Sequence, residues 1–330
     1  MERTEINEND LRECREIAQN CRDEAAKRLI GQSHVIDGIL TAMVSGGNIL
    51  LEGVPGLAKS LAARAFAEIS GLDFKRIQFT PDLLPADITG TLIYEQNSGR
   101  FSVHKGPVFT NVVFADEINR APAKVQSALL EAMAEKQVTI GETTYKLPDP
   151  FFVLATQNPI EQEGTYNLPE AELDRFLVKI VVPYPTASEE VKIVQTCGNA
   201  PLVPINKVFS VQSLKKCRML LDRIVCDEKI VEYIVSIVNV TRPSASIVRG
   251  KNDISKYIAF GASPRAGIAL LQCAKAQALF SGRSFVLPDD IKSVAKNVLR
   301  HRLVLSYEAA ASNVSADEII EKILELTPLP

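Results

Sequence analysis

The fold is decided by residues 53–60, which read Gly53-Val54-Pro55-Gly56-Leu57-Ala58-Lys59-Ser60. This stretch follows the apolar run 49–51 and precedes apolar residues at helical spacing over 61–69, so we expect a strand, a loop and a helix. The backbone N–H groups of such a loop and the N-terminus of its helix bind phosphate oxygens. Lys59 would contact the outer phosphates, and the Ser60 hydroxyl would ligate Mg²⁺. The sequence therefore predicts a nucleotide-binding loop.

One position departs from the general pattern of such loops. Ala58 stands where the second glycine is usual. A residue with a Cβ atom disfavours positive φ, so we expect Ala58 in an ordinary backbone region or a slightly altered loop. The plain alternative is a turn before a helix with a chance lysine, because isolated motif matches are often false. Other motifs in the chain are needed to choose between a nucleotide-binding loop and a chance match.

Short apolar runs alternate with helical patterns in the first half of the chain. The runs span 49–51, 74–79, 112–115, 151–155 and 177–182. This alternation predicts an α/β fold with a parallel five-stranded sheet and helices on both faces. Two passages, 91–103 and 137–147, interrupt it and are typical of inserted β-hairpins. A helix over 10–30, with Asn9 or Asp10 as N-cap, is expected before the first strand.

A proline-rich passage over 183–204 follows the last strand and contains a short helical pattern over 188–197. We place the domain junction there, with a nucleotide-binding core over 1–186 and a small all-helical lid domain over 187–330. The expected lid helices span 211–225, 227–240, 264–281, 289–299 and 316–326.

Two adjacent carboxylates, Asp116 and Glu117, follow the run 112–115. In a parallel sheet the ligand site lies beyond the carboxyl ends of the strands, so Asp116 would stand beside the loop and hold Mg²⁺ or its water shell. Glu117 would polarise the attacking water as general base. The plain alternative is that both residues only start the next helix, near Pro122. The loop upstream favours the catalytic interpretation.

Asn158 follows the run 151–155 in a Thr-Gln-Asn-Pro turn. Its amide donates and accepts at once, so it could orient the water between Glu117 and the terminal phosphate. An Asn-Pro turn is otherwise ordinary. The strand order favours the sensing role, because it places this end next to Asp116.

Two arginines complete the candidate site. Arg175 precedes the last core strand, and a local ion pair with Asp174 or Glu172 would be the plain explanation. Arg265 follows residues 263–264, a Ser-Pro pair typical of an N-cap and the first helical position. A cation in the first turn opposes the helix dipole by roughly 0.3 to 1 kcal/mol unless an anion is near. A nucleotide phosphate is the obvious anion.

The composition and charge of the chain exclude several classes of protein. The chain has 330 residues, 46% hydrophobic content and a formal net charge of -3, which is typical of a globular protein and not of a dedicated nucleic-acid binder. Its six cysteines and three histidines are scattered, so no metal site made of these residues is expected. The amino terminus is acidic where a signal peptide would be basic, and no apolar run approaches a membrane span. We expect a soluble, cytoplasmic protein.

Five ordered blocks resemble the MoxR family of AAA+ ATPases over nearly the whole chain. They are GVPGLAKS at 53–60, FADEINRA at 114–121, ATQNP at 155–159, LPEAELDRF at 168–176 and GASPRA at 261–266. The resemblance implies the AAA+ fold, in which Ala58 is usual. It also implies that hairpin 91–103 is the insert in helix 2 and that hairpin 137–147 precedes sensor 1.

The resemblance implies a homo-hexameric ring with ATP and Mg²⁺ at the subunit interfaces. Asn158 would be sensor 1, Arg175 the arginine finger supplied to the neighbouring subunit, and Arg265 sensor 2 on the lid. A finger in trans, which typically contributes roughly 10³ to 10⁵ in rate, would explain why activity needs assembly. The turn Gly31-Gln32 would pass the adenine.

The family's usual role is chaperone-like maturation of protein complexes, often with a partner that bears a von Willebrand factor A domain. We recognise no such domain in this sequence, so we expect the partner to be a separate chain, either such a protein or a metal-enzyme client.

Three other functions compete with this hypothesis. A nucleic-acid motor is one, since helix-2 inserts occur in replicative helicases, but segments 96–101 and 142–146 carry one basic residue each, which is few for tracking a phosphate backbone. An enhancer-binding transcription activator would need a G-A-F-T-G-A loop, which the sequence lacks. A switch that scarcely turns ATP over would need neither Glu117 nor Arg175. We therefore expect ATP hydrolysis, and nucleic-acid binding is not expected.

Overall fold

The computed structural model describes residues 6–159, 164–197, 203–243 and 254–330. Its centre is a five-stranded sheet with the strand order β2-β5-β8-β1-β9, in which every neighbouring pair is parallel. The strands are β1 (Asn48–Glu52), β2 (Phe74–Gln78), β5 (Val112–Asp116), β8 (Phe152–Gln157) and β9 (Phe176–Val181). The sequence prediction of the sheet is confirmed, with strand ends within one or two residues.

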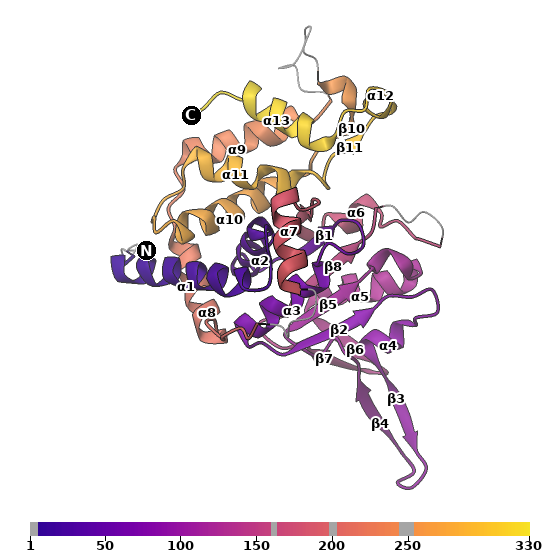
Figure 1. Cartoon of the computed structure of the whole chain (residues 1–330). Coiled ribbons are helices and arrows are strands. Elements are labelled where there is room, and N and C mark those ends of the chain that lie inside the picture. The colour runs from indigo at the N-terminus through magenta and orange to yellow at the C-terminus, as the bar shows by residue number, and fades with distance from the viewer. Residues whose placement is uncertain (1–5, 160–163, 198–202, 244–253) are drawn as a thin grey trace.

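The strands bury both of their faces. Alternate residues of β1 enter different cores: Ile49 and Leu51 pack into one apolar cluster, and Leu50 packs into the other. Helices α1 (Glu8–Ala26), α2 (Ser33–Val44) and α3 (Lys59–Ser70) contribute to the first cluster. Helices α4 (Pro85–Thr89) and α5 (Ala123–Glu135) cover the second. The sheet is thus a middle layer between two layers of helices (Figure 1).

Two hairpins are inserted, as expected. Strands β3 (Gly90–Glu95) and β4 (Arg100–Lys105) form an antiparallel hairpin that protrudes from the body of the molecule (Figure 1). The second hairpin consists of β6 (Gln137–Ile140) and β7 (Thr143–Lys146). Beyond it come the short helix α6 (Glu170–Leu173), which precedes β9, and α7 (Ala187–Cys197), which follows it.

The carboxyl-terminal region is helical, as predicted. It contains α8 (Val211–Arg223), α9 (Glu228–Val240), α10 (Pro264–Phe280), α11 (Pro288–Leu299), α12 (Tyr307–Ala311) and α13 (Ala316–Leu326). A short antiparallel pair, β10 (Ile258–Phe260) and β11 (Val304–Leu305), joins two of its loops and was not expected. The first apolar cluster runs without a break from the sheet into these helices. The boundary at 186/187 stays a prediction.

Two local predictions differ from the structure. The N-cap of α1 is Asn7, whose side chain accepts a hydrogen bond from the Asn9 backbone at 3.0 Å, so neither Asn9 nor Asp10 caps the helix. Helix α2 was not expected at all. Nine of its twelve residues are buried, so the polar side that reveals a surface helix in a sequence is narrow here.

Candidate nucleotide-binding site

The loop over 53–58 joins β1 to the N-terminus of α3, as a phosphate-binding loop requires. Gly56 has φ +86°, a conformation that glycine adopts readily. Ala58 has φ 56° and ψ 20°, so the expectation of an ordinary backbone region at this position is wrong. A non-glycine residue in this region costs on the order of 1 kcal/mol, and such strain is found most often at functional sites.

Lys59 folds back over the loop. Its ammonium donates hydrogen bonds to the Gly53 carbonyl and, at 2.9 Å, to the Val54 carbonyl. The turn that holds Gln32 lies against the same loop, because the Gln32 amide donates to the Leu57 carbonyl at 2.9 Å. Segments far apart in the sequence therefore meet at this loop. The contact of the Gly31-Gln32 turn with adenine stays a prediction.

Asp116 is the centre of the site. It ends β5 with 6% of its surface exposed, and three side chains contact its carboxylate. The Ser60 hydroxyl lies 3.4 Å from Oδ2, the Thr156 hydroxyl donates to Oδ1 at 2.7 Å, and the Arg76 guanidinium donates to Oδ2 at 2.7 and 3.1 Å. The adjacency of Asp116 to the loop, predicted from the parallel sheet, is present.

Glu117 lies next to this centre, half-buried and in the left-handed region at φ 57°. The Thr156 hydroxyl accepts its backbone N–H at 2.8 Å. Its carboxylate Oε2 accepts from the Gln78 amide at 3.0 Å and pairs with Arg120 at 3.3 Å. Strand β5 therefore presents one carboxylate toward the loop and a second one at the start of the turn that follows.

Asn158 lies just beyond the end of β8, with 3% of its surface exposed. Its backbone carbonyl accepts a hydrogen bond from the Asn119 amide at 3.3 Å. It stands two residues after Thr156, which contacts both Asp116 and Glu117. The strand order thus gives this end of β8 the position beside β5 that the sequence analysis assumed.

Arg265 contacts the residue next to Arg175 in the chain, Asp174, and neither arginine has a contact with the loop over 53–60 among the described residues. Arg175 is exposed and, among the described residues, makes no ion pair, so the local pair with Asp174 or Glu172 is absent. Arg265 lies 3.6 Å from Asp174, so a carboxylate is already near the first turn of α10. Ser263 stands at the N-cap, but its hydroxyl donates to Asp174 at 3.3 Å instead of capping the helix.

The residues present fit a nucleotide and a divalent cation. Ser60 and Asp116 place a hydroxyl and a carboxylate oxygen 3.4 Å apart, and oxygen ligands of this kind suit Mg²⁺. At the turn beside the loop, Gln32 Oε1 is buried without a hydrogen-bond partner among the described residues. A buried acceptor of this kind normally finds a donor, and the amino group of adenine would be one.

The sequence of the chain matches known families and proteins. Residues 48–178 match the "ATPase family associated with various cellular activities (AAA)", and residues 251–323 match the "AAA lid domain". The protein named "Chaperone MoxR1" from Mycobacterium tuberculosis is 46% identical, across 93% of this chain and 81% of that protein. The chain belongs to the MoxR family of AAA+ ATPases.

Two further proteins are similar over nearly the whole chain. "Protein MoxR" from Methylorubrum extorquens is 29% identical across 97% of each chain. The crystal structure of a protein from Cytophaga hutchinsonii, described as a candidate ATPase, superposes with a TM-score of 0.89 at 48% identity and covers 98% of each chain. Within the described part of this MoxR-family chain, every helix is too short or too polar to cross a membrane.

Sequence reasoning missed three side chains of this MoxR-type site. Arg76 and Gln78 lie on β2 and hold Asp116 and Glu117, and Thr156 joins both carboxyl-bearing residues. Gln78 lies opposite Asp116 in the ladder, but the sequence alone does not give this register. Thr156 belongs to the same turn as Asn158, but nothing in the pattern distinguished it.

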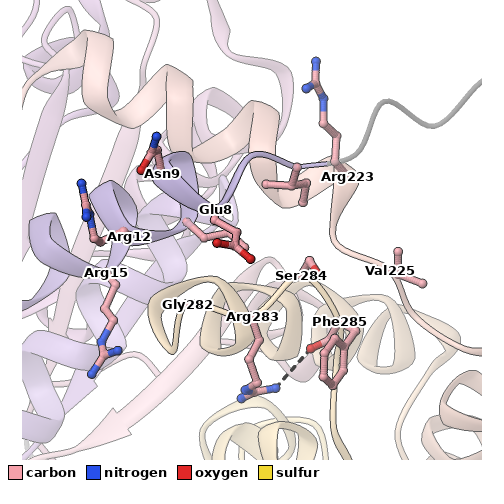
Figure 2. Close-up of a pocket in the computed structure, with 12 residues that line it drawn as sticks. Glu8, Asn9, Arg12, Arg15, Arg223, Val225, Gly282, Arg283, Ser284 and Phe285 are labelled. Carbon is pink, nitrogen blue, oxygen red and sulfur yellow. Dashed lines mark hydrogen bonds between the residues drawn. The ribbon is translucent and has the colours of Figure 1, made fainter.

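Figure 2 shows a different cavity of this MoxR-family chain, of about 780 Å³, between the start of α1 and the ends of α8 and α10. Four arginines line it: Arg12, Arg15, Arg223 and Arg283. Arg283 is paired with Asp290 at 2.6 Å and donates to the Phe285 carbonyl at 3.1 Å. None of the predicted site residues lines this cavity, so it is not the nucleotide site.

Proposed function

We propose that the chain binds ATP with Mg²⁺ and hydrolyses it at the loop 53–60. The observation that carries this proposal is the convergence on Asp116 of Ser60 from α3 and Thr156 from β8, with Glu117 beside it. An isolated loop of this sequence would bind phosphate only. The oxygen pair and the adjacent carboxylate supply the ligands and the base that hydrolysis needs.

Each side chain has a role that follows from its chemistry. Lys59, which reaches back to loop carbonyls in this structure, would bind phosphate oxygens in their place. Ser60 and Asp116 would hold Mg²⁺, which supplies charge neutralisation between the outer phosphates when bound. Glu117 would accept the proton of the attacking water, and Asn158 would orient that water. Backbone N–H groups for the phosphates would come from the loop glycines, Val54 and Leu57. Pro55, which has no N–H, would contribute to the shape of the loop.

The active form in this proposal is a homo-hexameric ring. Arg175 is exposed and unpaired within the described residues, which suits a finger that acts on the neighbouring subunit's nucleotide. Arg265 would bind a phosphate of its own subunit's nucleotide and would then exchange Asp174 for that phosphate. Completion of each site by a neighbour makes turnover dependent on assembly.

We propose a chaperone-like role for this activity: ATP turnover remodels a partner protein in the cytoplasm. The name of the mycobacterial relative supports it. The partner would be a separate protein with a von Willebrand factor A domain or a metal-enzyme client. The nucleic-acid motor is not favoured, because Arg100 and Lys105 are the only arginine or lysine residues of the protruding β3–β4 hairpin and lie at opposite ends of β4.

Two experiments test the proposal. Lys59→Ala should lose nucleotide binding, measured by titration with a fluorescent ATP analogue, and unchanged binding would exclude the loop as the site. Glu117→Gln, which should hold ATP without turnover, serves as bait in lysate of the source cell. ATP-dependent capture of a protein with a von Willebrand factor A domain supports the chaperone-like role, whereas nuclease-sensitive nucleic acid in its place contradicts it.

A further inference from the structure

Arg175 stands on a backbone that the carboxyl-terminal helices hold on both sides. The preceding residue, Asp174, accepts a hydrogen bond from Arg302 Nε at 2.7 Å. The carbonyl of the following residue, Phe176, accepts from Arg302 Nη2 at 2.8 Å and contacts His301 Nε2 at 3.0 Å. Both His301 and Arg302 lie in the turn after α11. Two residues of one turn thus contact the residues on either side of Arg175.

Arg302 is built into this position and is not a surface arginine. Its side chain is 4% exposed, and it donates to the Leu177 carbonyl at 3.0 Å in addition to its contacts with Asp174 and Phe176. Burial lowers the pKa of Arg302, and the Asp174 carboxylate opposes this effect. A buried guanidinium is tolerated only where its donors are satisfied, so each of these contacts constrains the geometry of the strand start.

Asp174 also contacts the start of α10. Arg265 lies 3.6 Å from its Oδ2 and the Ser263 hydroxyl donates to the same oxygen at 3.3 Å, while Arg302 contacts Oδ1. One carboxylate therefore touches the arginine proposed for the subunit's own nucleotide and the arginine that holds the backbone of Arg175. The side chain of Arg175 itself remains exposed.

We infer that Arg302 is a positioning residue for Arg175: by holding Asp174 and the Phe176 carbonyl, it fixes the backbone from which Arg175 reaches the neighbouring subunit's site. This inference rests on the proposed role of Arg175 in trans. Its consequence is that the helical region of one subunit controls turnover in the next subunit. A displacement of a catalytic group by about 1 Å can cost roughly 100-fold in rate.

The test compares two arginines near the end of α11: Arg302, which is buried, and Arg300, which is half-buried. Arg302→Lys keeps the charge but cannot form the forked contacts. The matched control is Arg300→Lys, because Arg300 also joins this turn to β9, through the Lys179 carbonyl at 3.1 Å, but contacts neither Asp174 nor Phe176. We expect Arg302→Lys to lower kcat about 10- to 100-fold with nucleotide affinity unchanged, whereas Arg300→Lys retains turnover.

Mixed rings separate positioning from general damage. Subunits with Arg302→Lys keep every residue proposed for their own nucleotide site, and their nucleotide affinity reports any effect through Arg265. Mixing them with Glu117→Gln subunits, which have an intact Arg175, should therefore restore part of the turnover. Damage to the whole fold would not be restored. If Arg302→Lys fails to fold, Asp174→Asn is the substitute: it removes the carboxylate that Arg302 holds on one side of Arg175, while the bonds from Arg302 to the carbonyls of β9 keep the fold together.

The outcomes distinguish this inference from the proposed function. Loss of turnover in Arg175→Ala, together with unchanged turnover or unrestored loss in Arg302→Lys, overturns the positioning role alone. Unchanged turnover in Arg175→Ala overturns the arginine finger and the inference with it. A lowered kcat that mixing restores, with the Arg300→Lys control active, supports the positioning role.

Discussion

The hydroxyl of Thr156 joins the two acidic residues of the site. It donates to Asp116 Oδ1 at 2.7 Å and accepts the Glu117 N–H at 2.8 Å, and Thr156 is fully buried. Glu117 is held in a left-handed backbone conformation that a side chain with a Cβ seldom adopts. We therefore consider Thr156 the residue that keeps both carboxylates in their relative orientation.

Replacement of this hydroxyl by a methyl group should impair both stability and turnover. Thr156→Val leaves the Glu117 N–H and one Asp116 oxygen without that partner, which costs about 1–3 kcal/mol in the free energy of unfolding. We expect turnover to fall at least tenfold, measured by phosphate release. Thr156→Ser is the matched control, because it retains the hydroxyl. Equal turnover of the valine and serine variants would exclude this role.

Among the individual residues of the site, those that belong to sequence motifs could be predicted. Lys59, Ser60, Asp116 and Glu117 could be predicted because they follow apolar runs that predict strands, and the carboxyl ends of parallel strands lie at one edge of the sheet. Arg76 and Gln78 could not, because their contacts depend on which strand lies beside β5, and β2 is distant from it in sequence. The left-handed conformation of Ala58 was also out of reach, since it opposes the local preference of alanine.

At the scale of elements, the turn after α11 connects the helical region to the first residue of β9. His301 is buried there, and its Nε2 contacts the Phe176 carbonyl at 3.0 Å. Burial, followed by the nearby Arg302 charge, places the pKa of His301 well below its ordinary value of 6.5. The imidazole is therefore neutral in the folded chain near pH 7.

This histidine should make the stability depend on pH. Below about pH 6.5 the unfolded chain binds a proton at this position and the folded chain does not, so the free energy of unfolding falls as the pH drops, by at most about 1.4 kcal/mol per unit. His301→Gln keeps an N–H donor and should flatten the slope in urea unfolding between about pH 5 and 7. His34→Gln, at an exposed histidine, is the control. An unchanged slope in His301→Gln would contradict the assignment.

Helices and strands with a clear periodicity of apolar residues could be predicted from the sequence, and those without it could not. The five strands and both hairpins follow from short apolar runs, glycine turns and alternation. Helix α2 was missed because nine of its twelve residues are buried, so few polar residues mark its outer side. Its Gly38 lies so close to β9 that an added Cβ would meet Ile180 at 2.1 Å. The pair β10–β11 could not be predicted because strands of two or three residues are too short to show an alternation of apolar and polar residues.

At the scale of the whole molecule, the account requires subunits to complete each other's sites. Arg175→Ala should retain nucleotide binding and lose turnover by roughly 10³-fold, since the finger acts in trans. Mixed rings of Arg175→Ala with Glu117→Gln subunits should regain part of the activity, measured as phosphate release at a fixed total concentration. Absence of any recovery across mixing ratios would count against action at an interface.

The central claim is that the chain hydrolyses ATP with Glu117 as the base. Its most direct test measures ATP binding and phosphate release side by side for the unmodified chain and for Glu117→Gln. We expect equal binding and a release rate at least 100-fold lower in Glu117→Gln. Equal release rates in the two proteins, or release by neither of them while both bind ATP, would contradict it.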